Sequence, residues 1–339
     1  MKKIRVEDAV GSVLAHDITR IVPGKSKGVG FKKGHIVRTE DIPELLKIGK
    51  QHLFILELSP DQLHEDDAAL RIARAVGSRR LEWTRPKEGK TNLIARCDGL
   101  LKIDVASLLE INRMEDIIIS TLKTGTPCKT GQITAATRII PLTIEAEKIN
   151  ALEAICAEAG PIIDIRPFRP FRVGGLVTGS EIAEGRIKDG FDDFITPKLT
   201  AYGCELIDKI IVGDEPAAIA AALRQLRHKG CELVITTGGL SVDPDDVTRM
   251  GVRSAGAELI NYGSPVLPGA MVLYAMLDGM PILGLPACVF YHPTTIFDLM
   301  LPRILANETI DRDTFAKMGH GGLCLDCETC RFPDCPFGR

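Results

Sequence analysis

Residues 233–248 read LVITTGGLSVDPDDVT, and this stretch decides the fold class. A short apolar run breaks into Thr237, Gly238 and Gly239, which is typical of a buried strand that stops at a tight turn. Glycine lets the backbone adopt positive φ and lets a ligand approach the main chain closely. In an open α/β sheet, ligands bind outside the carboxyl ends of the strands, and this loop is predicted to lie there.

Three acidic residues crowd the loop that follows the two glycines. Asp243, Asp245 and Asp246 fall within four residues, and a divalent cation or a positively charged ligand would relieve their repulsion. The alternative is a solvated acidic turn in which Asp245 or Asp246 caps the next helix. Taken alone, the loop favours the second interpretation, so its neighbours decide between the two.

The composition is that of a soluble globular protein with a substantial core. The chain has 339 residues, of which 45% are hydrophobic and 26% charged, and this length favours two or more domains. A net charge of −3 gives no general reason to expect nucleic-acid or membrane-surface binding, and no apolar run is long enough for a transmembrane helix. The opening MKKIRVEDAVG has no apolar stretch after its lysines, so we predict no signal peptide and a cytoplasmic location.

The patterns predict four segments: an α+β module at 1–77, a β-rich module with a connecting helix at 78–160, an α/β domain at 161–310 and a cysteine-rich tail at 311–339. From residue 171 to about 305 strands alternate with helices, which predicts a mostly parallel sheet with helices on both faces. Strands are expected near 172–178, 205–212, 232–237, 257–262 and 281–285, and helices near 194–202, 215–229, 246–255 and 289–304. In the first segment, 31–37 is predicted as a strand broken by a turn, and the acidic run 64–67 as a charged first turn of a helix.

Four loops of the α/β domain should gather at one edge of its sheet. They are the loops at 178–181, at 213–215, at the two glycines, and at 284–287. Their backbone N–H groups suit a phosphate and their carboxylates suit Mg²⁺ or the polar edge of a heterocycle. Nearby Arg172, Arg186 and Lys188 are candidates to complement phosphate charge. Helix caps also use Thr, Ser and Asp, so the joint pattern carries more weight than any single loop.

Residues 171–305 resemble the molybdopterin-binding domain shared by molybdopterin adenylyltransferases and molybdopterin molybdotransferases. The resemblance rests on TGSEIAEGRIKD (178–189), GDEP (213–216), TTGGLSVDPDDVT (236–248), PVLPGAM (265–271) and LGLPACVFYHPTTIFDLMLPRIL (283–305). The last of these departs from the LPG-x-P loop of the molybdotransferases, because 285–288 reads LPAC.

The resemblance implies roles for individual residues. Glu181 falls at the pterin-site glutamate, Asp214 at the acidic position of the second motif, and Asp246 at the aspartate linked to Mg²⁺ and nucleotide chemistry. Asp245 is the second candidate metal ligand. The implied pterin-binding set is Thr178, Gly179, Ser180, Glu181, Thr237, Gly238, Gly239, Ser241, Asp243, Pro268, Gly269 and Pro286. Mg²⁺ on Asp246 would bridge phosphate oxygens and neutralise charge during attack at phosphorus. A helix cap at Asp246 is compatible with that role.

Residues 6–18 and 31–56 resemble the front domains of molybdotransferases. The Asp-Gly-Tyr-Ala motif of that family is absent, and a cysteine tail stands where that family has a C-terminal β-domain. The tail places Cys324, Cys327, Cys330 and Cys335 in the spacing C-x₂-C-x₂-C-x₄-C-P. Four thiolates suit an iron–sulfur cluster or tetrahedral Zn²⁺, with His320 as a candidate substitute ligand.

The predicted function is in molybdenum cofactor biosynthesis. The chain is expected to bind molybdopterin or adenylyl-molybdopterin and to catalyse Mg²⁺-dependent molybdate insertion with AMP release, or the preceding adenylyl transfer from ATP. A non-catalytic carrier or redox sensor that docks a molybdoenzyme through its metal tail is the alternative, and a nucleotide hydrolase on the same fold is the third possibility. The related families form dimers or trimers, so a homo-oligomer is expected.

Overall fold

The computed structural model describes residues 2–22, 26–55, 59–241 and 247–338. Its internal contacts divide the chain into two units, Met1–Arg166 and Pro167–Arg339. The division falls inside the proline-containing stretch 161–170 of the sequence. Among the described residues, no helix has both the length and the apolar character needed to cross a membrane. The predicted division into four segments stays a prediction.

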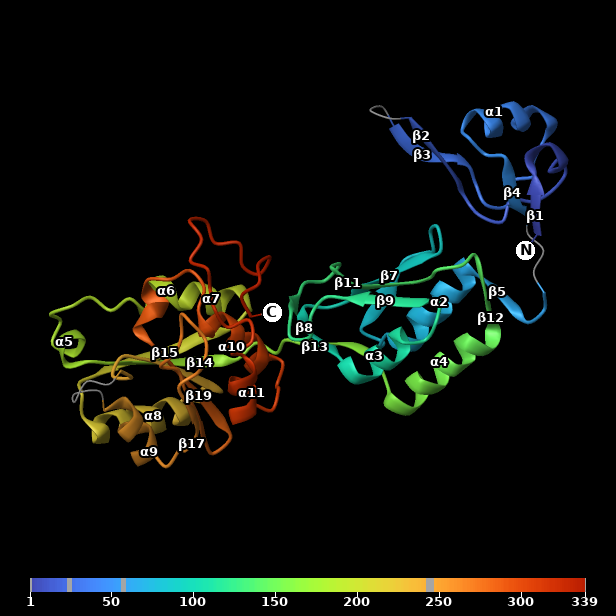
Figure 1. Ribbon diagram of the computed structural model, residues 1–339. Coiled ribbons are helices and arrows are strands. Elements are labelled where there is room, and N and C mark those ends of the chain that lie inside the picture. The colour runs from blue at the N-terminus through green and yellow to red at the C-terminus, as the bar shows by residue number, and fades with distance from the viewer. Residues whose placement is uncertain (1, 23–25, 56–58, 242–246, 339) are drawn as a thin grey trace. The chain divides into compact units, whose positions relative to one another are not determined.

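The first part of unit 1 is a small α+β fold around its own apolar core (Figure 1). Its elements are β1 (Lys2–Arg5), η1 (Val6–Asp8), β2 (Ile18–Val22), β3 (Ser26–Phe31), η2 (Thr39–Asp41), α1 (Ile42–Lys47) and β4 (His52–Ile55). β1 pairs antiparallel with β4, and β2 pairs antiparallel with β3. The prediction of a strand broken by a turn over 31–37 is confirmed in part. β3 ends at Phe31 and the chain turns at Gly34, which has φ +80°, but beyond the turn the segment pairs only through an isolated bridge between Ile36 and Val13.

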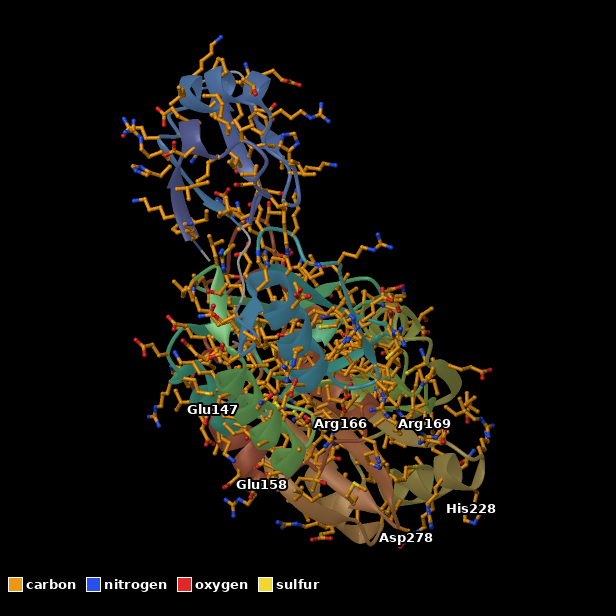
Figure 2. All side chains as sticks on the ribbon, turned by 90° about the vertical axis from the view of Figure 1, so that its right-hand side faces the viewer. Glu147, Glu158, Arg166, Arg169, His228 and Asp278 are labelled. Carbon is orange, nitrogen blue, oxygen red and sulfur yellow. The ribbon has the colours of Figure 1, made fainter. Side chains whose placement is uncertain are left out.

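The second part of unit 1 packs three helices and several strands around one apolar core. Its elements are β5 (Gln62–His64), α2 (Glu65–Val76), β6 (Leu81–Trp83), β7 (Lys90–Ala95), β8 (Gly99–Ile103), α3 (Val105–Asn112), β9 (Ile117–Thr121), β10 (Pro127–Cys128), β11 (Ile133–Ile139), β12 (Thr143–Glu145), α4 (Ala146–Ala159) and β13 (Ile163–Pro167). The sheets run β6-β7-β11-β9, β10-β8-β13 and β12-β5. α2 packs on β11 and α4, while Glu147 and Glu158 mark the exposed side of α4 (Figure 2).

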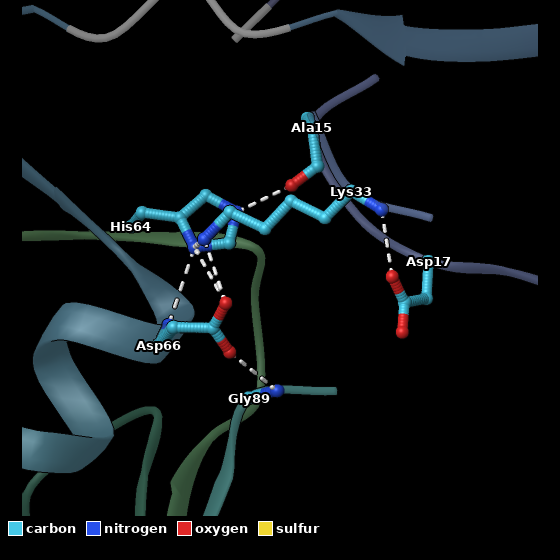
Figure 3. A network of polar contacts seen from close by, with 6 residues as sticks. All are labelled: Ala15, Asp17, Lys33, His64, Asp66 and Gly89. Atoms are coloured by element: carbon cyan, nitrogen blue, oxygen red, sulfur yellow. Dashed lines mark hydrogen bonds and ion pairs between the residues drawn. The ribbon is translucent and has the colours of Figure 1, made fainter. Parts of the chain in front are cut away.

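His64 joins the two parts of unit 1 (Figure 3). Its Nδ1 accepts hydrogen bonds from Lys33 Nζ at 2.8 Å and from the Asp66 N–H at 3.2 Å, so Nε2 carries the proton and donates to the Ala15 carbonyl oxygen. Lys33 Nζ also lies 2.6 Å from Asp66 Oδ2. Burial, together with the nearby charge of Lys33, lowers the pKa of His64 and outweighs the hydrogen bond to Ala15. The predicted charged first turn is confirmed for Glu65, Asp66 and Asp67, and His64 is the buried cap that precedes α2.

Unit 2 is an α/β domain around one six-stranded sheet with the order β15-β14-β16-β19-β18-β17. Its elements are β14 (Arg172–Thr178), α5 (Ser180–Ala183), α6 (Phe191–Phe194), α7 (Thr196–Ala201), β15 (Glu205–Val212), α8 (Pro216–His228), β16 (Leu233–Thr237), α9 (Thr248–Ser254), β17 (Glu258–Tyr262), β18 (Leu273–Leu277), β19 (Met280–Leu285), η3 (Ala287–Phe290), α10 (Ile296–Leu305) and α11 (Arg312–Lys317). β15, β14, β16 and β19 are parallel, and β18 and β17 complete one side antiparallel.

Successive side chains along the strands point to opposite faces of this sheet, and both faces are buried. In β16, Leu233 and Ile235 belong to the core with α6, α7 and α10, whereas Val234 belongs to the core with α8 and α9. Figure 1 shows these two helix groups on opposite faces of the sheet. A parallel sheet requires such cover because its crossover helices lie on its faces. The predicted α/β class, mostly parallel with helices on both faces, is confirmed.

Candidate functional site at the carboxyl edge of the sheet

The parallel strands of unit 2 contain a topological switch point between β14 and β16. From β14 the chain first crosses to β15 on one side and then to β16 on the other. The loops that follow these two central strands therefore diverge, and ligands of doubly wound domains bind where such loops part. Thr178 and Thr237, the last residues of β14 and β16, mark this position.

Buried threonine hydroxyls join the two central loops. The Thr178 hydroxyl lies 2.8 Å from that of Thr248 and 3.3 Å from the carbonyl oxygen of Thr237. The Thr248 hydroxyl also donates to the carbonyl oxygen of Gly238 at 3.1 Å. All three threonine side chains are buried, so these contacts are shielded from competing water. The start of α9 and both strand ends are thus held as one assembly.

The two glycines at the end of β16 allow the turn to approach β14. Gly238 and Gly239 have φ values of +89° and +56°. A Cβ built at Gly238 would lie 2.0 Å from the carbonyl oxygen of Thr178, and one at Gly239 would lie 2.4 Å from the Thr248 hydroxyl. No side chain fits at those separations, so the sequence needs glycine here for both conformation and space.

The loop after β14 is also tied to the loop after β15. The Ser180 N–H donates to Asp214 Oδ2 at 2.7 Å, and the Asp214 N–H donates to Ser180 Oγ at 3.3 Å. Gly179, with φ +141°, donates its N–H to the Val212 carbonyl oxygen at 3.1 Å. Asp214 therefore positions the loop that carries Glu181, whose side chain stays half-buried beside Gly179.

Tyr262 and Arg249, which were not among the predicted site residues, lie beside the glycine turn. The Tyr262 hydroxyl donates to the carbonyl oxygen of Leu240 at 2.6 Å, directly after the two glycines, and the Arg249 guanidinium lies 4.6 Å from the centre of the tyrosine ring. This cation–π pair brings a permanent positive charge close to the loop. Arg249 follows the DPDDVT run directly, which is the sequence signal that would have drawn attention to it.

Two further predicted loops are built around α10 and β19. Gly269 packs so closely on α10 that a Cβ there would lie 2.5 Å from Ile296 Cβ, and the Pro268 carbonyl oxygen accepts the Ile296 N–H at 3.2 Å. Pro286 is buried directly after β19. Next in this loop, burial raises the pKa of the Cys288 thiol against a backbone hydrogen bond that lowers it. At neutral pH Cys288 is therefore a thiol and not a thiolate nucleophile.

One predicted phosphate-binding residue lies at the wrong edge. Arg172 is the first residue of β14, so the seven-residue strand separates it from the carboxyl edge by about 20 Å. Its guanidinium donates to the carbonyl oxygen of Lys229 instead, at 3.4 Å. The prediction of Arg172 as a phosphate ligand is wrong, because Arg172 begins β14 and the proposed site lies at the other end of that strand. Arg186 pairs with Glu184 on the loop after β14, and Lys188 pairs with Asp193 of α6; all four side chains are exposed.

The predicted magnesium ligands Asp245 and Asp246, and the predicted pterin contact Asp243, fall outside the described residues. Ser241, the last residue described before them, is exposed. Within the described part of the chain, no three His, Cys, Asp or Glu side chains form a group that could hold a metal ion. Asp214 accepts a hydrogen bond from the Ser180 N–H, so the described structure gives it a positioning role in the loop.

Comparisons with known families and sequences cover parts of the chain. Residues 174–306 match the family described as "Probable molybdopterin binding domain", and residues 3–57 match a domain of unknown function, DUF8806. A CinA-like protein of Mycobacterium sp. (strain JLS) is 43% identical over 90 residues, which are 26% of this chain and 21% of that protein. The CinA-like protein of Mycobacterium tuberculosis (strain ATCC 25618 / H37Rv) is 39% identical over the same shares. The chain spans about a fifth of the length of these relatives.

Solved structures also resemble this domain. CinA from Thermoplasma acidophilum, a protein described as having unknown function, has a TM-score of 0.34 and 20% identity, covering 40% of this chain and 96% of its own. The molybdopterin biosynthesis enzyme MoaB from Thermus thermophilus has a TM-score of 0.33 and 24% identity, covering 40% of this chain and 91% of its own. The family match, which covers the whole carboxyl edge described above, makes residues 174–306 a domain of the molybdopterin-binding type.

Proposed function

We propose that unit 2 binds molybdopterin or adenylyl-molybdopterin at the carboxyl edge of its sheet and catalyses a step of cytoplasmic molybdenum cofactor biosynthesis. The step is molybdate insertion with release of AMP, or the preceding adenylyl transfer from ATP. The family match over 174–306, together with the hydrogen-bonded loops at the switch point, is the observation that supports the proposal.

Each loop has a role in this proposal. Glu181, held by the Ser180–Asp214 contacts, would accept hydrogen bonds from the N–H edge of the pterin. The turn at Gly238 would let a phosphate approach the backbone closely, and Arg249 is near enough to the loop to favour an anion. Asp245 and Asp246 are the proposed magnesium ligands from the sequence, and Mg²⁺ would neutralise phosphate charge when bound.

The decisive experiment follows AMP release from adenylyl-molybdopterin by anaerobically purified protein with Mg²⁺ and molybdate. We expect molybdate-dependent release by the wild type and at least about a hundredfold loss in Asp246→Asn, a loss on the scale of removing one electrostatic contact to the transition state. Asp278→Asn is the matched control, because Asp278 lies in the turn before β19 at the opposite edge and pairs with Arg227 (Figure 2).

The other outcomes divide the alternatives. Tight pterin binding without AMP release, and without ATP consumption in an adenylyl-transfer assay, would make the protein a cofactor carrier. Hydrolysis of free nucleotides with no pterin present would make it a nucleotide hydrolase. A wild type that neither binds pterin nor releases AMP would reject the proposal. Equal losses in both aspartate variants would reject the role of Asp246.

A further inference from the structure

The cysteine tail folds back onto unit 2 as a closed loop. The Gly338 N–H donates to the carbonyl oxygen of Gly321 at 2.8 Å, so the first and last residues of the loop meet. Phe337 is 3% exposed and belongs to the core under α10, and Cys324 and Cys335 pack against that core. This anchoring gives the intervening residues a fixed base although they form no helix or strand.

All four tail thiols line one hollow. Cys324, Cys327, Cys330 and Cys335 share it with His292, which precedes α10, whereas the predicted substitute ligand His320 is exposed and lies outside it. Cys330 Sγ lies 3.2 Å from the Thr294 hydroxyl, and Cys327 is exposed. The four cysteines are free, and no three of the described donors stand close enough together to ligate an ion. Binding would therefore require the loop to draw the exposed thiols inward over its fixed base.

The loop is also hydrogen-bonded to a loop of the candidate site. Leu267 donates its N–H to the Gly322 carbonyl oxygen at 2.8 Å and accepts the Cys324 N–H at 2.8 Å, which makes a parallel bridge between Leu267 and Leu323. Leu267 directly precedes Pro268 and Gly269, which contact the start of α10. Any change that orders the residues around Cys324 therefore acts on the Leu267 loop through these two bonds.

We propose that residues 321–338 close around a thiophilic metal centre, a zinc ion or an iron–sulfur cluster ligated by the four thiolates, and that this closure braces the Leu267 loop. Four thiolates satisfy either metal, and metal binding to an incompletely formed site supplies the free energy that orders it. The inference goes beyond the proposed function and does not depend on pterin binding.

The first test measures iron, acid-labile sulfide and zinc in anaerobically purified full-length protein, before and after reconstitution with each metal. We expect one zinc ion, or about four iron with matching sulfide, per chain. Cys327→Ser, which changes an exposed side chain, should lower the metal retained against a chelator at least about tenfold, on the scale of losing part of a metal's ligand environment. Cys97→Ser, in unit 1, should retain it.

The second test measures amide hydrogen exchange with and without metal. Metal removal should speed exchange at Leu267 about tenfold, which corresponds to roughly one net hydrogen bond. The Gly263 amide, which donates to Val272 at the other end of the same connection, should change little. Four freely titrating tail thiols in protein that binds neither metal, retention of metal by Cys327→Ser, or unchanged exchange at Leu267 would each overturn the proposal. Pterin affinity enters neither test, so failure of the proposed function remains distinguishable.

Discussion

Replacing Gly238 by alanine should damage unit 2 more than the same replacement at Gly256. Both glycines have a left-handed backbone, with φ +89° and +92°. An alanine at either position costs about 1–2 kcal/mol for that conformation. A Cβ at Gly256 meets no atom within 4 Å, whereas one at Gly238 would lie 2.0 Å from the Thr178 carbonyl oxygen and 2.8 Å from its hydroxyl. The turn at Gly238 must therefore move away from the end of β14, and this overpacking costs about 1–3 kcal/mol more.

The assay is hydrogen exchange at the buried β16 amides, because it reports the opening of unit 2 without assuming that the whole chain unfolds in one step. The difference of about 1–3 kcal/mol between the variants corresponds to about 5- to 150-fold faster exchange in Gly238→Ala than in Gly256→Ala. Equal exchange in the two variants would refute the reasoning, since it would mean that the close approach of the turn to β14 contributes nothing. Gly238→Ala should also weaken pterin binding, whereas Gly256→Ala should not.

Two further predictions concern buried hydrogen bonds. Thr178→Val removes the hydroxyl that contacts Thr248 and should destabilise unit 2 by about 1–3 kcal/mol, whereas Thr178→Ser keeps the hydroxyl and should cost less. Hydrogen exchange at the β16 amides measures both variants. Equal losses of stability in the two would contradict the assigned contacts. The second prediction concerns His64, whose pKa in the folded protein lies below the ordinary 6.5, so folding of unit 1 disfavours its protonation. The contribution of His64 to stability is therefore fully present above about pH 6.5 and is lost as the pH falls from there through the lowered pKa of the folded state. Urea unfolding followed by the fluorescence of Trp83, the one tryptophan of the chain, measures the stability of unit 1. His64→Gln should reduce the loss of stability with falling pH below about pH 6.5. An unchanged pH dependence in this variant would show that His64 is not its source.

Much of the unit 2 fold was predictable because its signals are local. The run ending in Gly238 and Gly239 marks a buried strand and a close turn, and β16 occupies Leu233–Thr237 as that pattern implies. A backbone at positive φ favours glycine, so the sequence alone indicates where this strand ends without reference to its distant contacts.

Two helices of unit 2 begin later than predicted, because residues in the cap and first turn, and not the apolar pattern, set where each helix starts. The helix predicted over 194–202 is α7, which begins at Thr196, and the short helix α6 directly before it was not predicted. Pro197 stands in the first turn of α7, where its missing N–H costs no intrahelical bond, so a new helix can start there. The helix predicted over 289–304 likewise begins only at Ile296, where Thr295 provides a cap.

The strand β18 was not predicted, although the sequence contains a hairpin signal for it. Without β18, the positions of Tyr262 and Arg249 at the site could not be predicted. Asp278 and Gly279 form a two-residue turn with φ +45° and +84°, and Leu277 pairs with Met280 across it. Asp-Gly between two apolar runs is a strong hairpin signal, because a type I′ turn needs positive φ at both positions. Recognising this hairpin would have made the sheet mixed and placed β17 beside β18 as its edge strand.

That placement has a direct consequence for the site. As the antiparallel partner of β18, β17 brings Tyr262, its last residue, opposite Leu273. From there its hydroxyl reaches the Leu240 carbonyl oxygen at the exit of the glycine turn, and it carries Arg249 on its ring. Neither contact can be predicted from the loops of the parallel strands, because both depend on the antiparallel direction of β18, which places β17 at the edge of the sheet. The glycine turn was therefore predictable from local sequence, whereas Tyr262 and Arg249 beside it could be placed only from the pairing of β17 with β18.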